Sequence, residues 1–308
     1  MKLNNDNYYS QKANQAYFSV SQVKDFLKCE AYAMAKLEGE WVEPPSTAML
    51  IGSYVDSYFE GTLEEFIENH PDMFVEKKCL NPKFISVIEE HPEYFTKALD
   101  VKAKYKETIS TPEKFLYSKK LNSKYQIAEK AIEKVTNDEL FMNCMSGEKQ
   151  VIMTGELFGA KWKIKMDSYI PHEAIVDLKV VQKLRDVSYK KGWRQSFIEK
   201  WGYDLQLGIY QEIVRQNTGE TLPCIIAAVD KQDYPDLDCI LIPDDQLKFQ
   251  RDELEWKMQR IIDVKNYNEK PERCGVCDYC RATKKLEKLI FPDDLIVFNL
   301  TSKEISCL

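Results

Sequence analysis

Two charged residues at alternate positions of a predicted strand are the first sign of chemistry in this sequence. Asp177 and Lys179 lie two residues apart in the segment AIVDLKVV, residues 174–181. Alternate residues of a strand point to the same face of its sheet, so both side chains are expected to reach one site. Val176 and Leu178 would then face a core on the opposite side.

A second carboxylate lies near the end of the preceding predicted strand, residues 161–169. A tight turn at Pro171 and His172 would bring Asp167 close to Asp177. Carboxylates are the ligands that Mg²⁺ prefers, and a bound divalent ion acidifies water and stabilises charge on a phosphate. A neighbouring lysine orients the attacking water or holds the developing negative charge. The group therefore suits metal-assisted phosphodiester hydrolysis.

An aspartate followed two residues later by a lysine is a common pattern, and it recurs at Asp100 and Asp263. The segment around Asp263 has helical periodicity, in which residues i and i+2 do not share a face. Asp100 lies in a polar region without a strand pattern. Only Asp177 combines a buried-strand pattern with a second carboxylate on the adjacent strand, so it is the candidate for catalysis.

Two more sets of residues lie downstream. Gln206 and Tyr210 share one face of a predicted helix, a pattern that an ordinary solvated helix also explains. Residues 179–200 carry seven lysines and arginines against two acidic residues, with aromatic side chains between them. Such a run fits either a phosphate-binding surface with stacking groups or a solvated charged loop. The candidate DNA-binding residues are Lys183, Arg185, Lys190, Lys191 and Arg194.

Three of the nine cysteines form the compact cluster RCGVCDYCR, with Cys274, Cys277 and Cys280 three residues apart. Thiolates at this spacing converge readily on one metal, and Gly275 permits the tight turn. Cys29, in the first predicted helix, is the best candidate for a fourth ligand. Four cysteines fit a 4Fe–4S cluster and zinc equally well by number, so both remain open.

Composition sets limits on the class of protein. The chain has 308 residues, 44% of them hydrophobic and 30% charged, with a net charge of −7. This is ordinary globular composition, and the acidic balance argues against nonspecific coating of nucleic acid but not against a local basic groove. No segment approaches the roughly 20 apolar residues of a membrane helix, and no apolar leader is evident. We expect a cytoplasmic protein without membrane contact.

The elements that must position these residues follow from periodicity. Helices are predicted for 19–38, 47–60, 195–217 and from 244 or 245 to about 264; strands are predicted for 150–158, 161–169, 174–181, 223–230 and 238–243. Residues 62–145 are expected to be rich in helix, and Gly159-Ala160 is expected to form a hairpin turn. The order predicts an α/β fold, with a mixed sheet flanked by helices and a helical N-terminal part.

The ordered motifs together resemble the PD-(D/E)xK nuclease superfamily. The residues that carry the resemblance are GEL, KIKMD, IVDLK and the Gln-x3-Tyr of LQLGIY, with SVSQVKDFLKC, GSYVDSYFEG and CGVCDYCR at the two ends. More narrowly, the chain is similar to phage and prophage exonucleases of the RecE (exonuclease VIII) type with RecB-like motifs. The resemblance implies a restriction-endonuclease-like core and one nuclease domain over 1–308. Its parts would be a helical 1–145, a mixed-sheet core 146–270, and the cysteine cluster and tail 271–308.

By this resemblance, Asp167 and Asp177 would be metal ligands, Lys179 the motif lysine, and Gln206 and Tyr210 the Gln-x3-Tyr that supports the site. The resemblance also relates the four cysteines to the iron–sulfur arrangement of AddB-type nucleases and their CRISPR-associated relatives, with a shorter last spacing here. Relatives carry a metal-binding histidine in an early Gly-x3-His helix. The matching residue here is Asp56, whose carboxylate is also a suitable Mg²⁺ ligand.

The resemblance implies a Mg²⁺- or Mn²⁺-dependent exodeoxyribonuclease that exposes single strands at duplex ends for recombination. It further implies 5′ to 3′ polarity, a single-strand annealing protein as partner, and a homo-oligomeric ring that encloses DNA. Three alternatives remain open: a non-catalytic DNA-binding module with a structural metal site, a nuclease of CRISPR adaptation, and RNA as the substrate.

Overall fold

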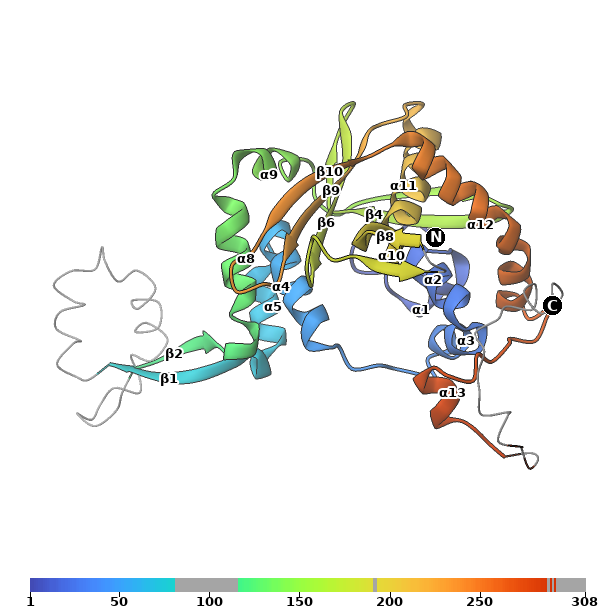
Figure 1. Cartoon of the computed structure of the whole chain (residues 1–308), viewed down its shortest axis with the longest axis horizontal. Helices are drawn as coiled ribbons and strands as arrows, with labels where there is room; N and C mark the ends of the chain where they lie inside the picture. Colours follow the sequence, from blue (N-terminus) through green and yellow to red (C-terminus); the bar gives the residue numbers. More distant parts are fainter. Residues whose placement is uncertain (81–115, 191–192, 287–288, 290, 292–308) are drawn as a thin grey trace.

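The computed structural model describes residues 1–80, 116–190, 193–286, 289 and 291 (Figure 1). The chain begins with α1 (Gln11–Ala16), α2 (Val20–Lys28), α3 (Glu30–Glu38), α4 (Thr47–Glu60), α5 (Leu63–Asn69) and the 3-10 turn η1 (Pro71–Met73). Next come β1 (Phe74–Leu80), β2 (Leu116–Leu121), the 3-10 turn η3 (Ser123–Tyr125), α8 (Ile127–Thr136) and α9 (Glu139–Cys144).

The second half forms the core. Its strands are β3 (Val151–Leu157), β4 (Ala160–Met166), β5 (Ser168–Ile170), β6 (Ala174–Val181), β7 (Ser188–Lys190), β8 (Trp193–Gln195), β9 (Cys224–Asp230) and β10 (Leu237–Ile242). Its helices are α10 (Phe197–Trp201), α11 (Tyr203–Thr218), α12 (Asp244–Lys265) and α13 (Asp278–Ala282). The protein is therefore a mixed α/β molecule with a helical N-terminal region, as the sequence predicts.

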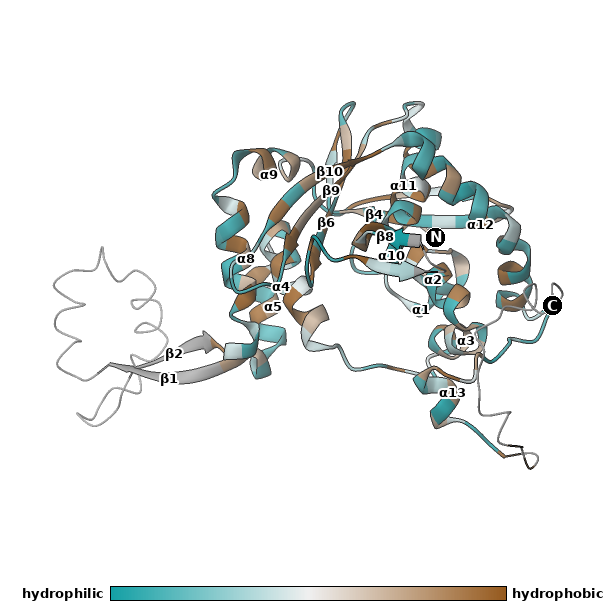
Figure 2. Ribbon diagram, viewed as in Figure 1, coloured by the Kyte–Doolittle hydropathy of each residue, from teal (hydrophilic) through white to brown (hydrophobic). Residues whose placement is uncertain are grey.

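The central sheet has the strand order β10-β9-β6-β5. Strands β6 and β9 are parallel, and the other two neighbouring pairs are antiparallel, so the sheet is mixed. Helix α11 contacts one face of β6. On the other face of the sheet, α4 contacts β6, and α8 and α9 contact β9 (Figure 1). Because both faces are covered, β6 and β9 are apolar along most of their length, as Figure 2 shows.

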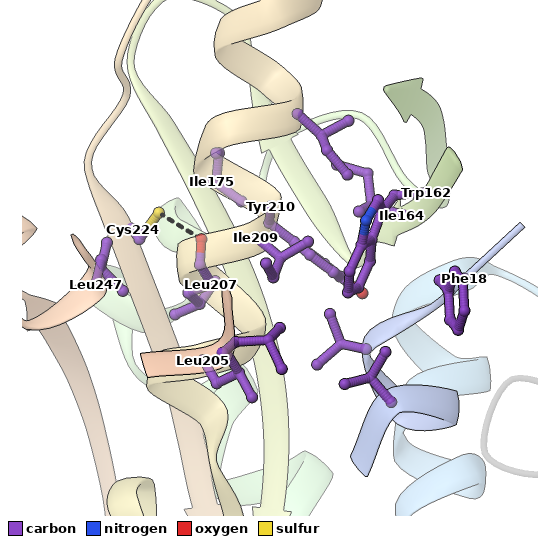
Figure 3. Packing of buried hydrophobic residues seen from close by; sticks show 14 of the residues in the cluster. Phe18, Trp162, Ile164, Ile175, Leu205, Leu207, Ile209, Tyr210, Cys224 and Leu247 are labelled. Carbon is purple, nitrogen blue, oxygen red and sulfur yellow. Dashed lines mark hydrogen bonds between the residues drawn. The ribbon is translucent and has the colours of Figure 1, made fainter. Parts of the chain in front are cut away.

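Alternate residues of β6 belong to two different cores. Ile175 packs with α11 and α12, whereas Val176 and Leu178 pack with α4, α8 and α9. Figure 3 shows the first core, in which α11 residues lie against Ile175 and Trp162. The prediction that Val176 and Leu178 face a core opposite to Asp177 is confirmed.

Two predicted helices are interrupted in the structure. The helix expected over 19–38 breaks at Cys29, whose backbone is extended with φ −167° and ψ 113°. The helix expected over 195–217 breaks at Gly202, which has φ 61° and both ends α10 and begins α11. Hydrophobic periodicity continues across both breaks, so it does not reveal them.

Smaller differences concern turns and edges. The β3–β4 hairpin turns at Phe158 and Gly159, both with positive φ, one residue earlier than predicted. The antiparallel pair β1–β2 lies within a region expected to be helical. Within the described residues, none of the helices has the length and apolar character needed to cross a membrane.

Candidate active site

The geometry of the site begins with the turn between β5 and β6. Ser168 pairs with Val176 in antiparallel register, so Asp167, just before β5, lies across from Asp177. The Oδ2 atom of Asp167 accepts a hydrogen bond of 2.8 Å from the backbone N–H of Leu178. The structure therefore brings together the two aspartates that the sequence predicted to meet.

Asp177 is only 2% exposed and has partners on both sides. Its Oδ2 atom lies 2.6 Å from Nζ of Lys179 on the same strand face. Its Oδ1 atom accepts a hydrogen bond of 2.8 Å from Nε2 of Gln206 on α11. Gln206 thus fixes the orientation of the Asp177 carboxylate.

Tyr210 lies one turn of α11 beyond Gln206 and has a different structural role. Its hydroxyl donates a hydrogen bond of 3.1 Å to the backbone carbonyl of Lys165 on β4. Its ring is part of the buried core in Figure 3. Tyr210 therefore ties α11 to the β3–β4 hairpin rather than contacting the carboxylates.

The electrostatics of this cluster favour a bound cation. Burial, followed by the charge of Asp177, raises the pKa of Asp167 to about 7. Burial and the charge of Asp167 likewise raise the pKa of Asp56. Burial alone would lower the pKa of Lys179. The negative charges of Asp177 and Asp167 have the larger effect, so the pKa of Lys179 is raised. One ammonium thus faces three carboxylates, which are costly to bury without further positive charge.

The buried Oδ2 atom of Asp177 is paired with the Lys179 ammonium at 2.6 Å, and a carboxylate oxygen has a second lone pair that can accept a further positive partner. Oxygen ligands, buried negative charge and an available lone pair together fit Mg²⁺ or Mn²⁺. The structure places Asp56, on α4, in the wall of a small cavity that Asp167 also lines.

A second, larger cavity of about 300 Å³ opens between α2 and α11. It is lined by Gln206 and Tyr210 and by four lysines that the sequence did not single out as ligands of nucleic acid: Lys24, Lys36, Lys163 and Lys165. Lys163 and Lys165 stand out in the sequence only as part of the alternating β4 pattern, and Lys24 gives no local signal. Burial, and then the charge of Lys179, lowers the pKa of Lys24 to about 8.

Of the basic segment predicted to bind DNA, the described residues Lys183, Arg185 and Arg194 line neither cavity. Arg185 forms ion pairs with Asp236 at 3.4 Å and Asp238 at 2.9 Å, so its charge is largely neutralised. Lys183 and Arg194 are exposed. Lys190 ends β7, but its side chain is outside the described part, and Lys191 lies outside it altogether.

The four predicted cysteines meet in space. The sulfur atoms of Cys29, Cys274, Cys277 and Cys280 all lie within 4.8 Å of one another, and none forms a disulfide. Sγ of Cys29 lies 3.6 Å from Sγ of Cys280, which in turn lies 4.0 Å from Sγ of Cys274. The extended backbone at Cys29 ends α2 and begins α3, and its thiol reaches the cluster from this break.

Backbone N–H groups point at these sulfurs. The N–H of Cys277 donates to Sγ of Cys274 at 3.3 Å, and the N–H of Cys280 donates to Sγ of Cys277 at 3.5 Å. Burial raises the pKa of the Cys274 thiol, but N–H groups of Cys277 and Val276 outweigh it and lower the pKa to about 6. These donors therefore stabilise the thiolate of Cys274, the form that binds a metal, whereas burial raises the pKa of the Cys29 and Cys277 thiols. The cluster can therefore hold a metal.

Comparisons with known proteins agree with this geometry. A model of the family described as "PDDEXK-like domain of unknown function (DUF3799)" matches residues 19–283. A crystal structure from Eubacterium rectale, described as a "Putative exonuclease", is 44% identical, with a TM-score of 0.80. The alignment covers 96% of this chain and 98% of that chain. No curated protein matches the chain.

Proposed function

This chain belongs to the PDDEXK-like family DUF3799, and from that membership we propose that it is a metal-dependent exonuclease acting on DNA ends. The observation that carries the proposal is the meeting of Asp167, Asp177 and Lys179 on adjacent strands, with Gln206 bonded to Asp177. The "Putative exonuclease" description of the Eubacterium rectale relative supports the same reaction class.

Each residue has a role in the proposed reaction. Asp167 and Asp177, with Asp56, would hold a divalent ion, which would supply Lewis acidity and acidify bound water. Lys179 presents its ammonium to the reacting phosphate and stabilises the negative charge that develops on it. Gln206 keeps the Asp177 carboxylate oriented, as a hydrogen-bonded partner of a metal ligand does.

The larger cavity binds the nucleic acid strand. Lys24 and Lys165 line it, and in the described part of the chain neither forms an ion pair with a carboxylate. Both ammonium groups are thus available to backbone phosphates. Tyr9 also lines the cavity, is 70% exposed and lies under Nζ of Lys165, with 4.8 Å from that atom to the ring centroid. Its ring offers a stacking surface for a base.

For the cysteine cluster we propose a single zinc ion. Four sulfurs bound at about 2.3 Å to one tetrahedral ion lie about 3.8 Å apart. The separations of 3.6 and 4.0 Å lie near this value, and all the sulfurs lie within 4.8 Å of one another. A 4Fe–4S cluster binds each thiolate through a different iron and needs wider separations. Zinc would hold α2 and α3 against the C-terminal segment and so support Lys24, which lies on α2.

From the family resemblance we further propose that the enzyme degrades DNA with 5′ to 3′ polarity, acts with a single-strand annealing protein and forms a ring-shaped homo-oligomer. Polarity is tested with strands labelled at one end, and oligomeric state by light scattering of the full chain.

The decisive experiment uses purified protein with end-labelled linear duplex and with closed circular DNA, each with and without Mg²⁺. We expect Mg²⁺-dependent release of nucleotides from the linear DNA alone. Cleavage of circular DNA would replace exonuclease with endonuclease, and preference for RNA would change the substrate. Binding of DNA without hydrolysis under any metal would leave a non-catalytic DNA-binding module.

A further inference from the structure

Tyr203, the first residue of α11, has two lysines of the proposed site over its ring. The ring centroid lies 5.2 Å from Nζ of Lys179 and 5.3 Å from Nζ of Lys24. An ammonium within about 6 Å of an aromatic face is attracted by the negative charge of that face. The ring is half-buried, and its hydroxyl makes no hydrogen bond within the described residues. The contact with the lysines is therefore made by the ring and not by the hydroxyl.

Lys24 has few other contacts that could hold it. Within the described residues its ammonium forms no hydrogen bond and no ion pair, and Asp177 and Asp204 act on it only at longer range. Its side chain passes Gly202, where a Cβ atom would lie 3.3 Å from Cε of Lys24. Gly202 has φ 61° and no side chain, so the junction of α10 and α11 leaves room for the lysine. The Tyr203 ring and this junction together form a seat for Lys24.

Lys179 is held by two further partners. Its ammonium is paired with Oδ2 of Asp177 at 2.6 Å and donates a hydrogen bond of 3.1 Å to the backbone carbonyl of Leu178. An ammonium has three N–H donors, so one donor remains for a ligand. At 5.2 Å the Tyr203 ring attracts the positive charge without taking up this donor.

The ring of Tyr203 is itself fixed by its surroundings. Phe197 on α10 is buried and contacts it, with 6.2 Å between the ring centroids and 65° between the ring planes. Tyr203 also packs against the core of buried residues that includes Phe197 and Leu205. Because Ser196 caps α10 and Gly202 joins it to α11, the two rings sit on well-defined helix ends. Such a ring can hold flexible lysine side chains in place.

From these contacts we propose that Tyr203 is a positioning residue that holds Lys24 and Lys179 so that they contact nearby phosphates of one nucleic acid strand. Lys179 contacts the phosphate that is hydrolysed, and Lys24 contacts another phosphate of the strand in the larger cavity, which it lines. Two like charges on flexible side chains repel each other, and their shared attraction to one ring opposes this. The inference rests on the proposed function and deepens it, because it names the residue that sets the two phosphate contacts relative to each other.

The test changes the charge distribution of the ring and keeps its shape. Phenylalanine and pentafluorophenylalanine are each placed at position 203 of the full chain, because fluorine removes the negative charge of the ring face. DNA affinity is measured by fluorescence anisotropy in EDTA. We expect Tyr203→Phe to bind within about twofold of the wild type and the pentafluorophenylalanine variant to bind at least about threefold more weakly. With saturating DNA and Mg²⁺, kcat should fall in the same order.

The matched control places the same two residues at position 234. Tyr234 is 94% exposed, and no lysine or arginine lies over its ring in the part of the chain that the structure describes. Both variants at this position should bind DNA as the wild type does. Circular dichroism and melting temperature check that every variant is folded.

A double-mutant cycle tests whether Tyr203 acts through Lys24. In a Lys24→Met background the two ring variants at position 203 should bind DNA within about twofold of each other, because the group that the ring positions is gone. Equal DNA affinity of the two ring variants in the otherwise wild-type chain would overturn the inference, and so would an undiminished difference in the Lys24→Met background. If DNA is hydrolysed but the ring variants do not differ, the nuclease function stands and the positioning role fails. If the ring variants differ in DNA affinity but no DNA is hydrolysed, the positioning role stands and the nuclease function fails. A wild-type protein that binds no DNA would overturn both.

Discussion

Asp167 is tied to the strand that carries Asp177 through its hydrogen bond of 2.8 Å from the backbone N–H of Leu178. The donor is part of the backbone, so no substitution in β6 other than Leu178→Pro removes it directly. The bond fixes Asp167 relative to Asp177 before any ligand binds. Such preorganisation keeps the ligand oxygens from having to reorganise when a metal or substrate arrives.

Removing the charge of Asp177 or Lys179 should abolish most hydrolysis. We expect Asp177→Asn and Lys179→Met each to lower kcat by at least about 100-fold, because they remove a metal ligand and a charge at the phosphate. Release of labelled nucleotides from linear DNA measures the effect, and circular dichroism checks folding.

The matched control is Asp263→Asn, since Asp263 also precedes a lysine by two residues. It lies on α12, where its carboxylate accepts hydrogen bonds from Gln259 and Asn268. We expect nearly normal turnover from this variant. Loss of activity in Asp263→Asn with normal activity in Asp177→Asn would show that the wrong aspartate was chosen.

Gln206 should matter through Asp177 rather than through substrate. Gln206→Leu removes the hydrogen bond to Oδ1 of Asp177, and we expect metal affinity and kcat to fall by about 10- to 100-fold. Higher Mg²⁺ concentrations should restore part of the activity. Gln216→Leu, further along α11, is the control because Gln216 bonds to Glu156 outside the site. Equal losses in both variants would indicate damage to the helix instead.

Lys24 should contribute to DNA affinity in a pH-dependent way. Its pKa of about 8 means that the ammonium is charged below pH 8 and neutral above it, so affinity should fall between pH 7 and pH 9. Lys24→Arg keeps its charge throughout and should show a flatter pH profile. Fluorescence anisotropy in EDTA measures binding without hydrolysis.

Arg185 provides the contrast, because Asp236 and Asp238 already pair with it. Arg185→Ala should change DNA affinity little, whereas Lys24→Ala should weaken it and lower the salt dependence by about one phosphate contact. A larger loss of DNA affinity in Arg185→Ala than in Lys24→Ala would show that DNA binds to the basic segment predicted from the sequence.

The cysteine site should contain one zinc per chain and no iron. Replacement by Co²⁺ should give the strong visible bands of tetrahedral thiolate coordination. Cys29→Ser and Cys274→Ser should lose the metal and lower the melting temperature, because metal binding and folding are coupled. Cys239→Ser, outside the cluster, should keep it. A brown protein with stoichiometric iron and sulfide would show that the iron–sulfur interpretation is correct.

The sequence by itself determined the parts of this protein that depend on short-range patterns. The strand around Asp177, the strand before Asp167 and the close spacing of Cys274, Cys277 and Cys280 all follow from periodicities of two or three residues. These periodicities reflect which side chains share a face or a turn, and that geometry is set locally by the backbone. The α/β fold class followed from the order of the same elements.

Tertiary structure alone decided how distant segments complete the site. The helix breaks at Cys29, and the thiol of Cys29 contacts Cys274 and Cys280, more than 240 residues later in the chain. A helical pattern of hydrophobic residues contains no information about such a distant contact. Arg185 belongs to a basic run in the sequence, yet two aspartates of another segment neutralise it. Lys24 gives no local signal at all. Its position in the larger cavity depends on how α2 packs against α11, because burial and charge pairing are properties of contacts between segments, not of either segment alone.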